Sequence, residues 1–400
     1  MGQTDPSTGH ARPLRLLYVS RTWAMGGAQS ILLSLIRAMP RDRFEILVAP
    51  WDTGIEADTV FAREAAQAGA RLTAPIRWQG WRTSAASATA QIAALVAGEA
   101  IDVLHTHDNV SSTLVGWSRR RFPGPTVATA FGWWELNLKL KLLYGIERRM
   151  ALPRFDRVYT VSEDMAARIR ASGTDPARLE VIHTGLDLQD WSPRGTRAAV
   201  RARHGIAPDA LVVGALGRVS PEKGMDHLIA AMVQLTPEFP GLVAFLAGKG
   251  PDLPRLRDMA ASVGLGARFL TPGFVQDGAA ALEALDVAVM PSILPEGFPT
   301  ASVEAQALGL PIVASDIGGT RETLVPGVTG ALVPPGDPLA LAQALAPLLR
   351  DAALRHRMGA AARARVEAEF ALPGMLHRMA GFYDRAIAAN RAANAQPKRR

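Results

Sequence analysis

Short apolar stretches of strand length alternate with longer amphipathic stretches along most of the chain. The apolar stretches are LRLLYVS, FEILVAP, DVLHTH, TVATAF, RVYTVS and LEVIHTG in the first half, then LVVGALG, LVAFLAG, RFLTPG, DVAVMPS, PIVASD and GALVPP. This alternation is typical of parallel α/β layers, because a parallel strand is reached through a crossover helix. The pattern predicts two doubly wound parallel-sheet α/β domains with a cleft between them.

The same pattern divides the chain into segments. The predicted segments are a flexible N-terminus (1–13), a first domain (14–190), a polar linker rich in Pro and Gly (191–210), a second domain (211–365), a helix that crosses back to the first domain (366–393) and a basic tail (394–400). Almost every predicted strand ends in Gly, Ser, Pro or His. In doubly wound sheets the strand ends carry the binding loops, so the substrates are expected there.

Composition narrows the class of protein. Hydrophobic residues make up 48% and charged residues 20% of the 400 residues, which is typical of globular proteins. No apolar run approaches the ~18 residues of a membrane helix, and the N-terminus lacks the apolar core of a signal peptide. The chain contains no cysteine, which agrees with a reducing compartment. We therefore expect a cytoplasmic protein.

The formal charge of +7 favours anionic partners, among them phosphorylated substrates, nucleic acid and acidic lipids. The sequence has no interleaved aromatic and basic residues, the pattern that would indicate a nucleic-acid surface. Nucleic acid is therefore not an expected partner.

Two carboxylates stand eight positions apart in PEGFPTASVEAQ, with Glu296 on a predicted loop and Glu304 on the helix that follows. A loop carboxylate at a strand end can accept hydrogen bonds from sugar hydroxyls. The backbone N–H groups of Gly297, Phe298 and Thr300 would point toward an anion at the start of the helix. The segment predicts a sugar-nucleotide site, although two glutamates at this spacing also occur by chance.

Cations and glycines follow several other predicted strands. Arg218 and Lys223, in GRVSPEKG after Gly217, could hold a diphosphate, with a solvated charged loop as the alternative. Gly250 in LAGKGP could let the backbone approach a ligand or merely turn the chain. Further glycines, Gly26 and Gly27, lie between the first strand and its helix, where they permit close approach to phosphate.

Several motifs are absent from the sequence. It contains neither a G-x-G-x-x-G after a strand nor a G-x-x-x-x-G-K-[ST], so dinucleotide oxidoreductases and P-loop ATPases lose their main support. It also lacks an Asp-x-Asp pair, so protein cations and helix N-termini would have to neutralise a leaving diphosphate. His105 and His107 alternate on one strand without a completed ligand set, and no metal site is expected.

An ordered series of motifs resembles the retaining glycosyltransferases of family 4, which have the GT-B fold of two Rossmann-like domains facing each other across a cleft. The series is GGAQ, DVLHTHD, RVYTVSEDM, VIHTGLD, GRVSPEKG, LAGKGP, EGFPTASVEAQALGLPIVAS and GGTRE. The resemblance implies a nucleotide-sugar donor on the second domain and an acceptor on the first.

The resemblance also implies roles for individual residues. Arg218 and Lys223 would hold the donor diphosphate, Glu304 the ribose and Glu296 the donor sugar. The remaining donor-side positions are Gly26, Gly27, Gly217, Gly250, Gly297, Phe298 and Thr300, and the acceptor-side positions are His105, His107, Asp108 and Phe131.

The chain departs from the family pattern in two places. Phe131-Gly132 stands where many members have His-Gly, and Thr184-Gly185 stands where Asn-Gly is usual. The second change is mild, since Thr also hydrogen-bonds in turns. The first removes a histidine from the reacting centre, so the departing phosphate, His107 or His105 would take the acceptor proton.

These observations predict a metal-independent retaining hexosyltransferase without a cofactor. It would move a sugar from a UDP- or GDP-linked donor to a glycan, lipid-linked or small-molecule acceptor, with cell-surface polysaccharide synthesis as the expected setting. The alternatives are a two-Rossmann nucleotide-sugar epimerase and a non-catalytic nucleotide-sugar binding protein.

The segment 133–150 suggests a peripheral membrane contact. The apolar residues that recur there at helical spacing are Leu136, Leu140, Leu143 and Met150. The basic residues among them are Lys139, Lys141, Arg148 and Arg149, against the acidic Glu135 and Glu147. Such a helix could lie on an anionic membrane surface. The alternative is a helix that packs on its own domain.

Overall fold

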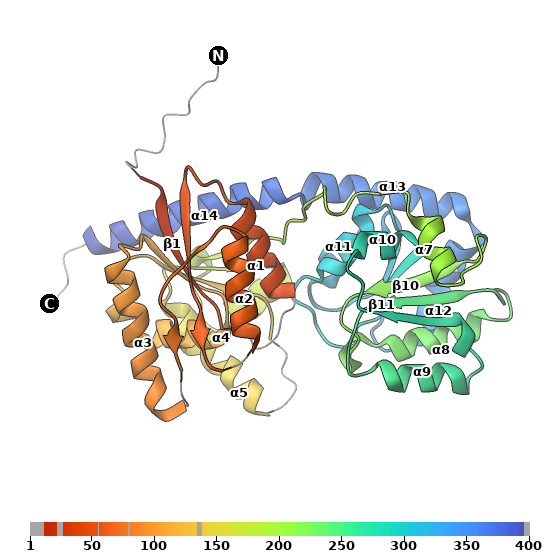
Figure 1. Ribbon diagram of the computed structural model, residues 1–400, viewed down its shortest axis with the longest axis horizontal. Coiled ribbons are helices and arrows are strands. Elements are labelled where there is room, and N and C mark those ends of the chain that lie inside the picture. Colours follow the sequence, from red (N-terminus) through yellow and green to blue (C-terminus); the bar gives the residue numbers. More distant parts are fainter. Residues whose placement is uncertain (1–11, 22–26, 55, 79–80, 134–137, 396–400) are drawn as a thin grey trace, which may run out of the picture. The chain divides into compact units, whose positions relative to one another are not determined.

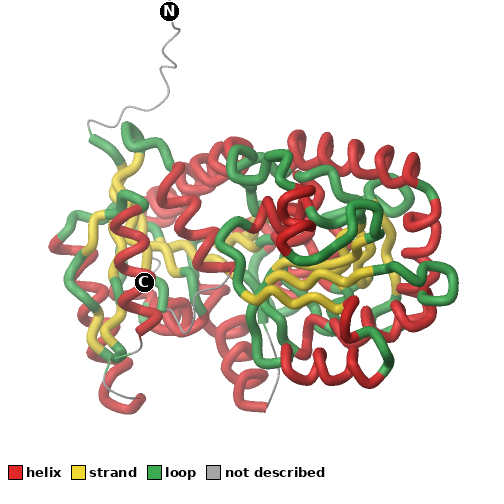
Figure 2. The backbone as a smooth tube through the Cα atoms, turned by 45° about the vertical axis from the view of Figure 1, so that its right-hand side comes forward, coloured by secondary structure: helices red, strands yellow, loops and turns green. Residues whose placement is uncertain are grey.

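The computed structural model describes residues 12–395 except 22–26, 55, 79–80 and 134–137. The chain divides into two compact units, one formed by Met1–Ile182 with Leu376–Arg400 and the other by His183–Met375. Each unit has a parallel sheet between helices (Figures 1 and 2).

The first unit is built on a seven-stranded sheet with strand order β4-β2-β1-β6-β7-β8-β9. Its strands are β1 (Leu14–Val19), β2 (Phe44–Ala49), β4 (Arg71–Leu72), β6 (Val103–Thr106), β7 (Thr126–Ala130), β8 (Arg157–Thr160) and β9 (Leu179–Val181), with β3 (Trp51–Asp52) and β5 (Ile76–Arg77) forming a separate pair. Its helices are α1 (Gly27–Ala38), α2 (Glu56–Gln67), α3 (Trp81–Gly98), α4 (Asn109–Trp117), α5 (Leu138–Ile146) and α6 (Glu163–Arg170). A π-helical turn, η2 (Glu147–Ala151), and a 3-10 turn, η3 (Leu152–Arg154), follow α5.

The second unit is built on a six-stranded sheet with strand order β12-β11-β10-β13-β14-β15. Its strands are β10 (Val212–Leu216), β11 (Val243–Ala247), β12 (Phe269–Gly273), β13 (Val287–Met290), β14 (Ile312–Ser315) and β15 (Gly330–Val333). Its helices are α7 (Arg197–Arg203), α8 (Met225–Leu235), α9 (Leu253–Ser262), α10 (Gly278–Glu283), α11 (Thr300–Ala307), α12 (Pro338–Arg350) and α13 (Ala352–Glu369). Helix α14 (Leu372–Ala395) begins in this unit and belongs to the first unit from Leu376 onward.

Both faces of the second sheet are buried, which explains why its strands are almost wholly apolar. Val213 and Leu246 belong to one hydrophobic cluster, with side chains of α8, α9 and α12. Their chain neighbours Val212 and Phe245 belong to another cluster on the opposite face, with side chains of α10. Successive side chains of a strand point to opposite faces, so alternate residues join different layers.

The predicted fold class is confirmed, because all twelve predicted strands are present and pair in parallel. Strands β3, β4 and β5 were not predicted, since two residues each carry no periodicity. The segment predicted as a linker lies within the second unit. There Arg201 of α7 is 3% exposed and its guanidinium lies 2.9 Å from the Asp286 carboxylate.

Candidate active site

The donor-side residues gather where the strand order of the second sheet reverses. Strands β10 and β13 are neighbours, but the chain continues to β11 on one side and β14 on the other. In open α/β sheets the crossover helices leave such a reversal in opposite directions, and ligands bind at the carboxyl ends of the two strands there. Arg218 and Lys223 follow β10, and Glu296 follows β13. This topology brings residues from distant parts of the chain to one edge.

The turn after β10 depends on glycine. Gly217 has φ 136° and Gly224 has φ 63°, conformations that side chains other than glycine rarely adopt. A Cβ at Gly224 would also lie 2.1 Å from the carbonyl oxygen of Pro291, in the segment after β13. The two loops are therefore in backbone contact, which holds Lys223 beside the Glu296 loop.

An ion pair connects the two loops. Lys223 Nζ lies 2.5 Å from Glu296 Oε2, and the side chains are 20% and 14% exposed. The Ser292 hydroxyl donates to the other carboxylate oxygen of Glu296. The Glu296 carbonyl accepts from the N–H of Gly319 at 2.8 Å, so the GGTRE turn supports the loop from behind.

A second carboxylate holds Arg218. Glu222 forms an ion pair with the Arg218 guanidinium and accepts from the Ser220 hydroxyl at 2.7 Å. Burial alone would raise the pKa of Glu222, but the hydrogen bonds and the charges of Arg218 and Lys223 lower it overall. The Arg218 side chain remains 45% exposed. Its charge is thus positioned by the turn and accessible to solvent.

Glu304 lies on α11, one turn after the helix begins at Thr300. Burial raises the pKa of Glu304 to about 7, and a hydrogen bond with the Thr300 side chain acts in the opposite direction. The first N–H groups of such a helix have no intrahelical acceptor and favour an anion. The side chain of Phe298 is buried between His183 and Phe370, with ring centroids 5.1 and 5.4 Å away. Phe298 can therefore offer a ligand its backbone, while its ring anchors the loop.

The glycines of LAGKGP are required for close packing of backbone on backbone. A Cβ at Gly250 would lie 1.7 Å from the Val219 carbonyl oxygen, and one at Gly248 equally close to that of Gly217. Val219 in turn donates its N–H to the Lys249 carbonyl at 2.9 Å. Gly250 thus supports the loop that carries Arg218.

The first unit has an equivalent reversal of strand order between β1 and β6. Asp108 directly follows this strand end and caps α4, accepting from the N–H groups of Val110 and Ser111 at 2.8 and 2.9 Å. It also accepts from the N–H of Arg21 at 2.7 Å and so joins the loops after β1 and β6. Asp108 therefore has a structural role.

His105 and His107 are buried at the end of β6. Their ring centroids are 3.8 Å apart, and Phe131 stacks on His107 at 6.4 Å with an interplanar angle of 23°. Burial lowers the pKa of His107 to about 3. Burial, and then the neighbouring His107, lower the pKa of His105 well below its usual value. Both imidazoles are therefore neutral at neutral pH.

Several residues of the site were not identified from the sequence. Ser292 and Glu222 fix Glu296 and Arg218, and their only sequence signal is their place within PS and PEK after strands β13 and β10. Thr129 contacts both buried histidines and had no signal. Of the predicted glycines, Gly26 lies outside the described residues, and Gly27 is exposed with open space around it.

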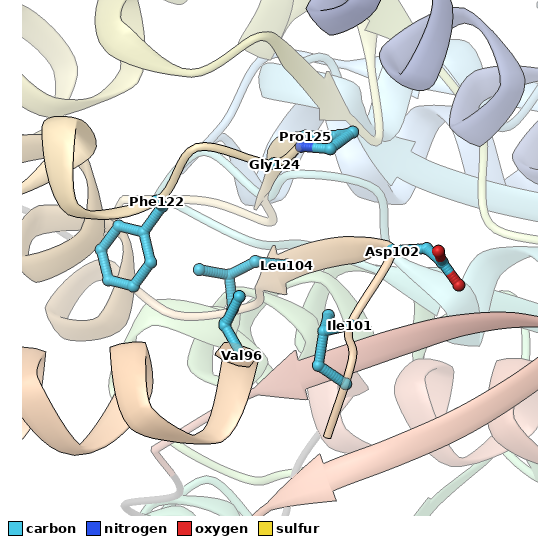
Figure 3. A pocket seen from close by; sticks show the side chains of 7 residues that line it. All are labelled: Val96, Ile101, Asp102, Leu104, Phe122, Gly124 and Pro125. Carbon is cyan, nitrogen blue, oxygen red and sulfur yellow. The ribbon is translucent and has the colours of Figure 1, made fainter. Parts of the chain in front are cut away.

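A small hollow in the first unit lies away from these residues. Val96, Ile101, Leu104, Phe122 and Pro125 are among the side chains that line it (Figure 3). Asp102 and Pro125 precede β6 and β7, so the hollow lies at the amino ends of strands whose carboxyl ends carry His107 and Phe131. Within the described ranges, no group of three His, Asp or Glu side chains could hold a metal ion.

Two family models match most of the chain. Residues 25–190 match "Glycosyltransferase Family 4" and residues 196–365 match "Glycosyl transferases group 1". The D-inositol 3-phosphate glycosyltransferase of Geodermatophilus obscurus is 34% identical over 284 residues, 66% of this chain and 62% of that protein. The protein of the same name from Mycobacterium tuberculosis H37Ra is 34% identical over 307 residues, 72% of this chain and 62% of that protein. The match thus spans 62% of the length of these curated relatives.

Solved structures share the fold. Anabaena HepE in complex with UDP has a TM-score of 0.81 at 22% identity, covering 93% of this chain and 100% of that chain. Sucrose-phosphate synthase from Thermosynechococcus elongatus has a TM-score of 0.75 at 23% identity, covering 94% and 100%. Together with the family models, these matches show that the chain belongs to the family 4 type of glycosyltransferases and has their GT-B fold.

Proposed function

We propose that the protein transfers a sugar from a nucleotide-diphosphate sugar to a hydroxyl group of an acceptor, with retention at the anomeric carbon. The observation that carries this proposal is the pairing of Lys223 and Glu296 across the reversal of strand order. This pairing supports the proposal, because a cation can bind a phosphate and a neighbouring carboxylate can accept hydrogen bonds from sugar hydroxyls. A UDP-linked donor is the first to test, because the solved HepE structures contain UDP and UDP-glucose.

In the proposed reaction the bond between the anomeric carbon and the diphosphate oxygen breaks. Arg218 and Lys223 stabilise the negative charge on the departing diphosphate. Glu304 accepts hydrogen bonds from the ribose hydroxyls, and Glu296 positions the donor sugar. The acceptor oxygen bonds to the same face of the anomeric carbon, and its proton passes to an oxygen of the departing diphosphate. Such a reaction needs neither a metal ion nor a side-chain base.

The acceptor is proposed to be a glycan, a lipid-linked sugar or a small molecule, in the cytoplasm and within cell-surface polysaccharide synthesis. The curated relatives are named for D-inositol 3-phosphate, so this compound is the first acceptor to try. The alternatives are a nucleotide-sugar epimerase and a non-catalytic binding protein.

A panel of UDP- and GDP-sugars would test the proposal. Thermal stabilisation identifies the donor, since a ligand at ~100 times its dissociation constant adds about 2.7 kcal/mol. The purified protein should then hydrolyse that donor slowly without acceptor and retain the anomeric configuration in the product, as judged by NMR. Activity should persist in EDTA. Epimerised donor, or binding without turnover, would contradict transfer.

We also propose that the first unit contacts an anionic membrane surface. Leu138, Leu142 and Met150 are 83%, 65% and 42% exposed, and Lys141 and Arg149 beside them are exposed as well. Glu147 does not oppose these cations at the surface: it is 2% exposed and accepts from the Trp133 indole at 2.9 Å. Of the leucines in the predicted stripe, Leu136 lies outside the described residues and Leu140 and Leu143 are half-buried, so the exposed leucines of this segment are Leu138 and Leu142 instead. No helix of the described residues is long and apolar enough to cross a membrane.

Sedimentation with acidic liposomes at low and high salt tests the membrane proposal. We expect salt-sensitive binding that is lost in Leu138→Ser/Leu142→Ser. Leu339→Ser is the matched control, because Leu339 is 53% exposed in the second unit. Equal binding of the double variant and the control would rule out this surface.

A further inference from the structure

A chain of buried hydrogen bonds connects α14 with His107. The hydroxyl oxygens of Tyr18 and Tyr383 lie 2.8 Å apart, and Tyr383 Oη lies 2.8 Å from His105 Nδ1. His105 Nε2 lies 2.7 Å from Thr129 Oγ1, which lies 3.2 Å from His107 Nδ1. Tyr383 belongs to the part of α14 that lies in the first unit, so every member of the chain is in that unit.

The series of hydrogen bonds ends at Nε2 of His107. Among the residues that the structure describes, the buried Nε2 of His107 has no hydrogen-bond partner. His107 is 5% exposed, whereas Tyr18, Tyr383 and His105 are 0% exposed. A hydroxyl or ring N–H that donates to none of the contacts in this hydrogen-bonded series would therefore have no water as acceptor. Leaving such a buried donor unsatisfied costs free energy.

The hydrogens can be assigned by counting. With neutral rings, the three hydroxyls and two imidazoles supply five hydrogens for four contacts. If Tyr18 donates to Tyr383, Tyr383 to His105 Nδ1, His105 Nε2 to Thr129, and Thr129 to His107 Nδ1, then all four contacts are filled. The fifth hydrogen is then on His107 Nε2, which is the only unsatisfied group.

Every other assignment that fills the four contacts is worse. In each one His107 donates from Nδ1, so its Nε2 lone pair is left without a donor. The surplus hydrogen then falls on a hydroxyl of Tyr18, Tyr383 or Thr129, and each of these side chains is at most 2% exposed. Two unsatisfied buried groups replace one. The first assignment is therefore the favoured tautomer.

We propose that Tyr18, Tyr383, His105 and Thr129 are positioning residues that fix His107 as a neutral hydrogen-bond donor at Nε2. Its ligand is an oxygen with a free lone pair, such as an acceptor hydroxyl or a phosphate oxygen. The identity of this ligand rests on the proposed function, but the tautomer does not. His107 cannot then take the acceptor proton at Nε2, because that nitrogen has no lone pair and Nδ1 is held by Thr129.

The low pKa of His107 agrees with a ring that stays neutral, but it does not distinguish the tautomers. The hydrogen-bond chain does so, because it links Nδ1 to the Thr129 hydroxyl, which donates to Nδ1 in the assignment that leaves the fewest buried groups unsatisfied. Many family members have a histidine at the position of Phe131, and a base at His107 therefore does not replace that imidazole.

Nitrogen NMR of the full-length protein labelled with ¹⁵N-histidine tests the tautomer directly. A ring nitrogen that carries hydrogen resonates well apart from one that does not, and His107→Gln and His105→Gln assign the signals. We expect His107 to have hydrogen on Nε2 at neutral pH. Hydrogen on Nδ1 would overturn the proposal.

Removal of one hydroxyl tests the relay. Tyr383→Phe deletes the donor to His105 Nδ1, so the His107 signals should shift toward the other tautomer. Tyr144→Phe is the matched control, because Tyr144 lies on α5 and takes part in none of the four contacts. Unchanged His107 signals in Tyr383→Phe would overturn the relay.

Transfer assays then separate this inference from the proposed function. His107→Gln retains an N–H donor and should keep about ten times the transfer rate of His107→Leu or more. Donor binding measured separately identifies the ligand: it should be weaker in His107→Leu if Nε2 donates to a phosphate oxygen and equal in both variants if it donates to an acceptor hydroxyl. Equal rates in the two variants would overturn the donor role. If the wild-type protein shows no transfer with any donor, the proposed function fails, while the tautomer result still stands.

Discussion

Lys223 and Glu296 are 73 positions apart in the chain, yet Lys223 Nζ lies 2.5 Å from Glu296 Oε2. The contact forms because β10 and β13 are neighbours at the reversal of strand order, and their loops share backbone contacts. A donor diphosphate that approaches Lys223 would exchange the Glu296 carboxylate for phosphate oxygens. Glu296 would then be released to accept hydrogen bonds from the sugar.

The first prediction concerns the two cations. Lys223→Ala and Arg218→Ala should each remove most transfer activity, because both cations would stabilise the negative charge that grows on the departing diphosphate. Loss of one such contact typically lowers kcat by about 10²–10³-fold. Steady-state kinetics of the purified variants measure this, with the exposed Arg357→Ala of α13 as control. Near-normal turnover in either variant would contradict the assignment.

The second prediction concerns donor affinity. Glu304→Gln should raise the KM of the donor more than it lowers kcat, because contacts to ribose are similar in the ground and transition states. Initial rates at varied donor concentration give both constants. An unchanged donor KM would mean that Glu304 does not contact the donor and acts only within α11.

The third prediction concerns stability. The pKa of Glu304 is about 7 in the folded protein against 4.5 ordinarily, so between these values the folded state binds more protons than the unfolded state. Its contribution to the free energy of unfolding therefore falls as pH rises from 4.5 to 7 and is level above 7. At about 1.4 kcal/mol per pKa unit, the loss is at most about 3–4 kcal/mol.

Denaturant unfolding at several pH values measures this loss. Glu304→Gln should gain stability relative to wild type as pH rises from 5 to 8. Glu147 contributes a slope of the same sign in both proteins, since burial also raises its pKa to about 7. The difference between the two proteins isolates Glu304, and a constant difference across this range would contradict the shifted pKa.

The fourth prediction concerns the loop that carries Arg218. Gly250→Ala should destabilise the protein by about 1–3 kcal/mol or more, because the new Cβ would lie 1.7 Å from the Val219 carbonyl oxygen. Donor binding should weaken as well. Gly241→Ala is the control, since a Cβ there meets nothing within 4 Å. Thermal unfolding compares the two variants. Equal midpoint temperatures would show that the loop moves to accommodate the new Cβ without loss of stability.

The fifth prediction concerns the pH profile. The buried His105 and His107 stay neutral, so neither should produce a limb near the ordinary imidazole pKa of ~6.5. A limb of kcat/KM near pH 7 is expected from Glu304, whose charged form would accept hydrogen bonds from the ribose hydroxyls in the proposed reaction. It should disappear in Glu304→Gln and remain in His107→Gln and Phe131→His. Loss of the limb in His107→Gln instead would assign it to that histidine.

The sequence by itself determined the strands, the fold class and the loops that carry the candidate residues. Apolar stretches such as DVAVMPS and LVVGALG are buried on both faces, so their pattern is strong. Glycines after strands marked the turns, because Gly217 and Gly224 adopt conformations closed to other residues. These signals are local, and a local signal can be read without the fold.

Only the tertiary structure decided which side chains meet. It paired Lys223 with Glu296 and Arg218 with Glu222, turned Phe298 into the core, and buried Glu147 against Trp133. It also brought Tyr383 to His105 across 278 positions. Such contacts depend on strand order and on which face of a helix is covered. Neither is encoded in a short stretch of sequence, because each results from the packing of elements that lie far apart along the chain.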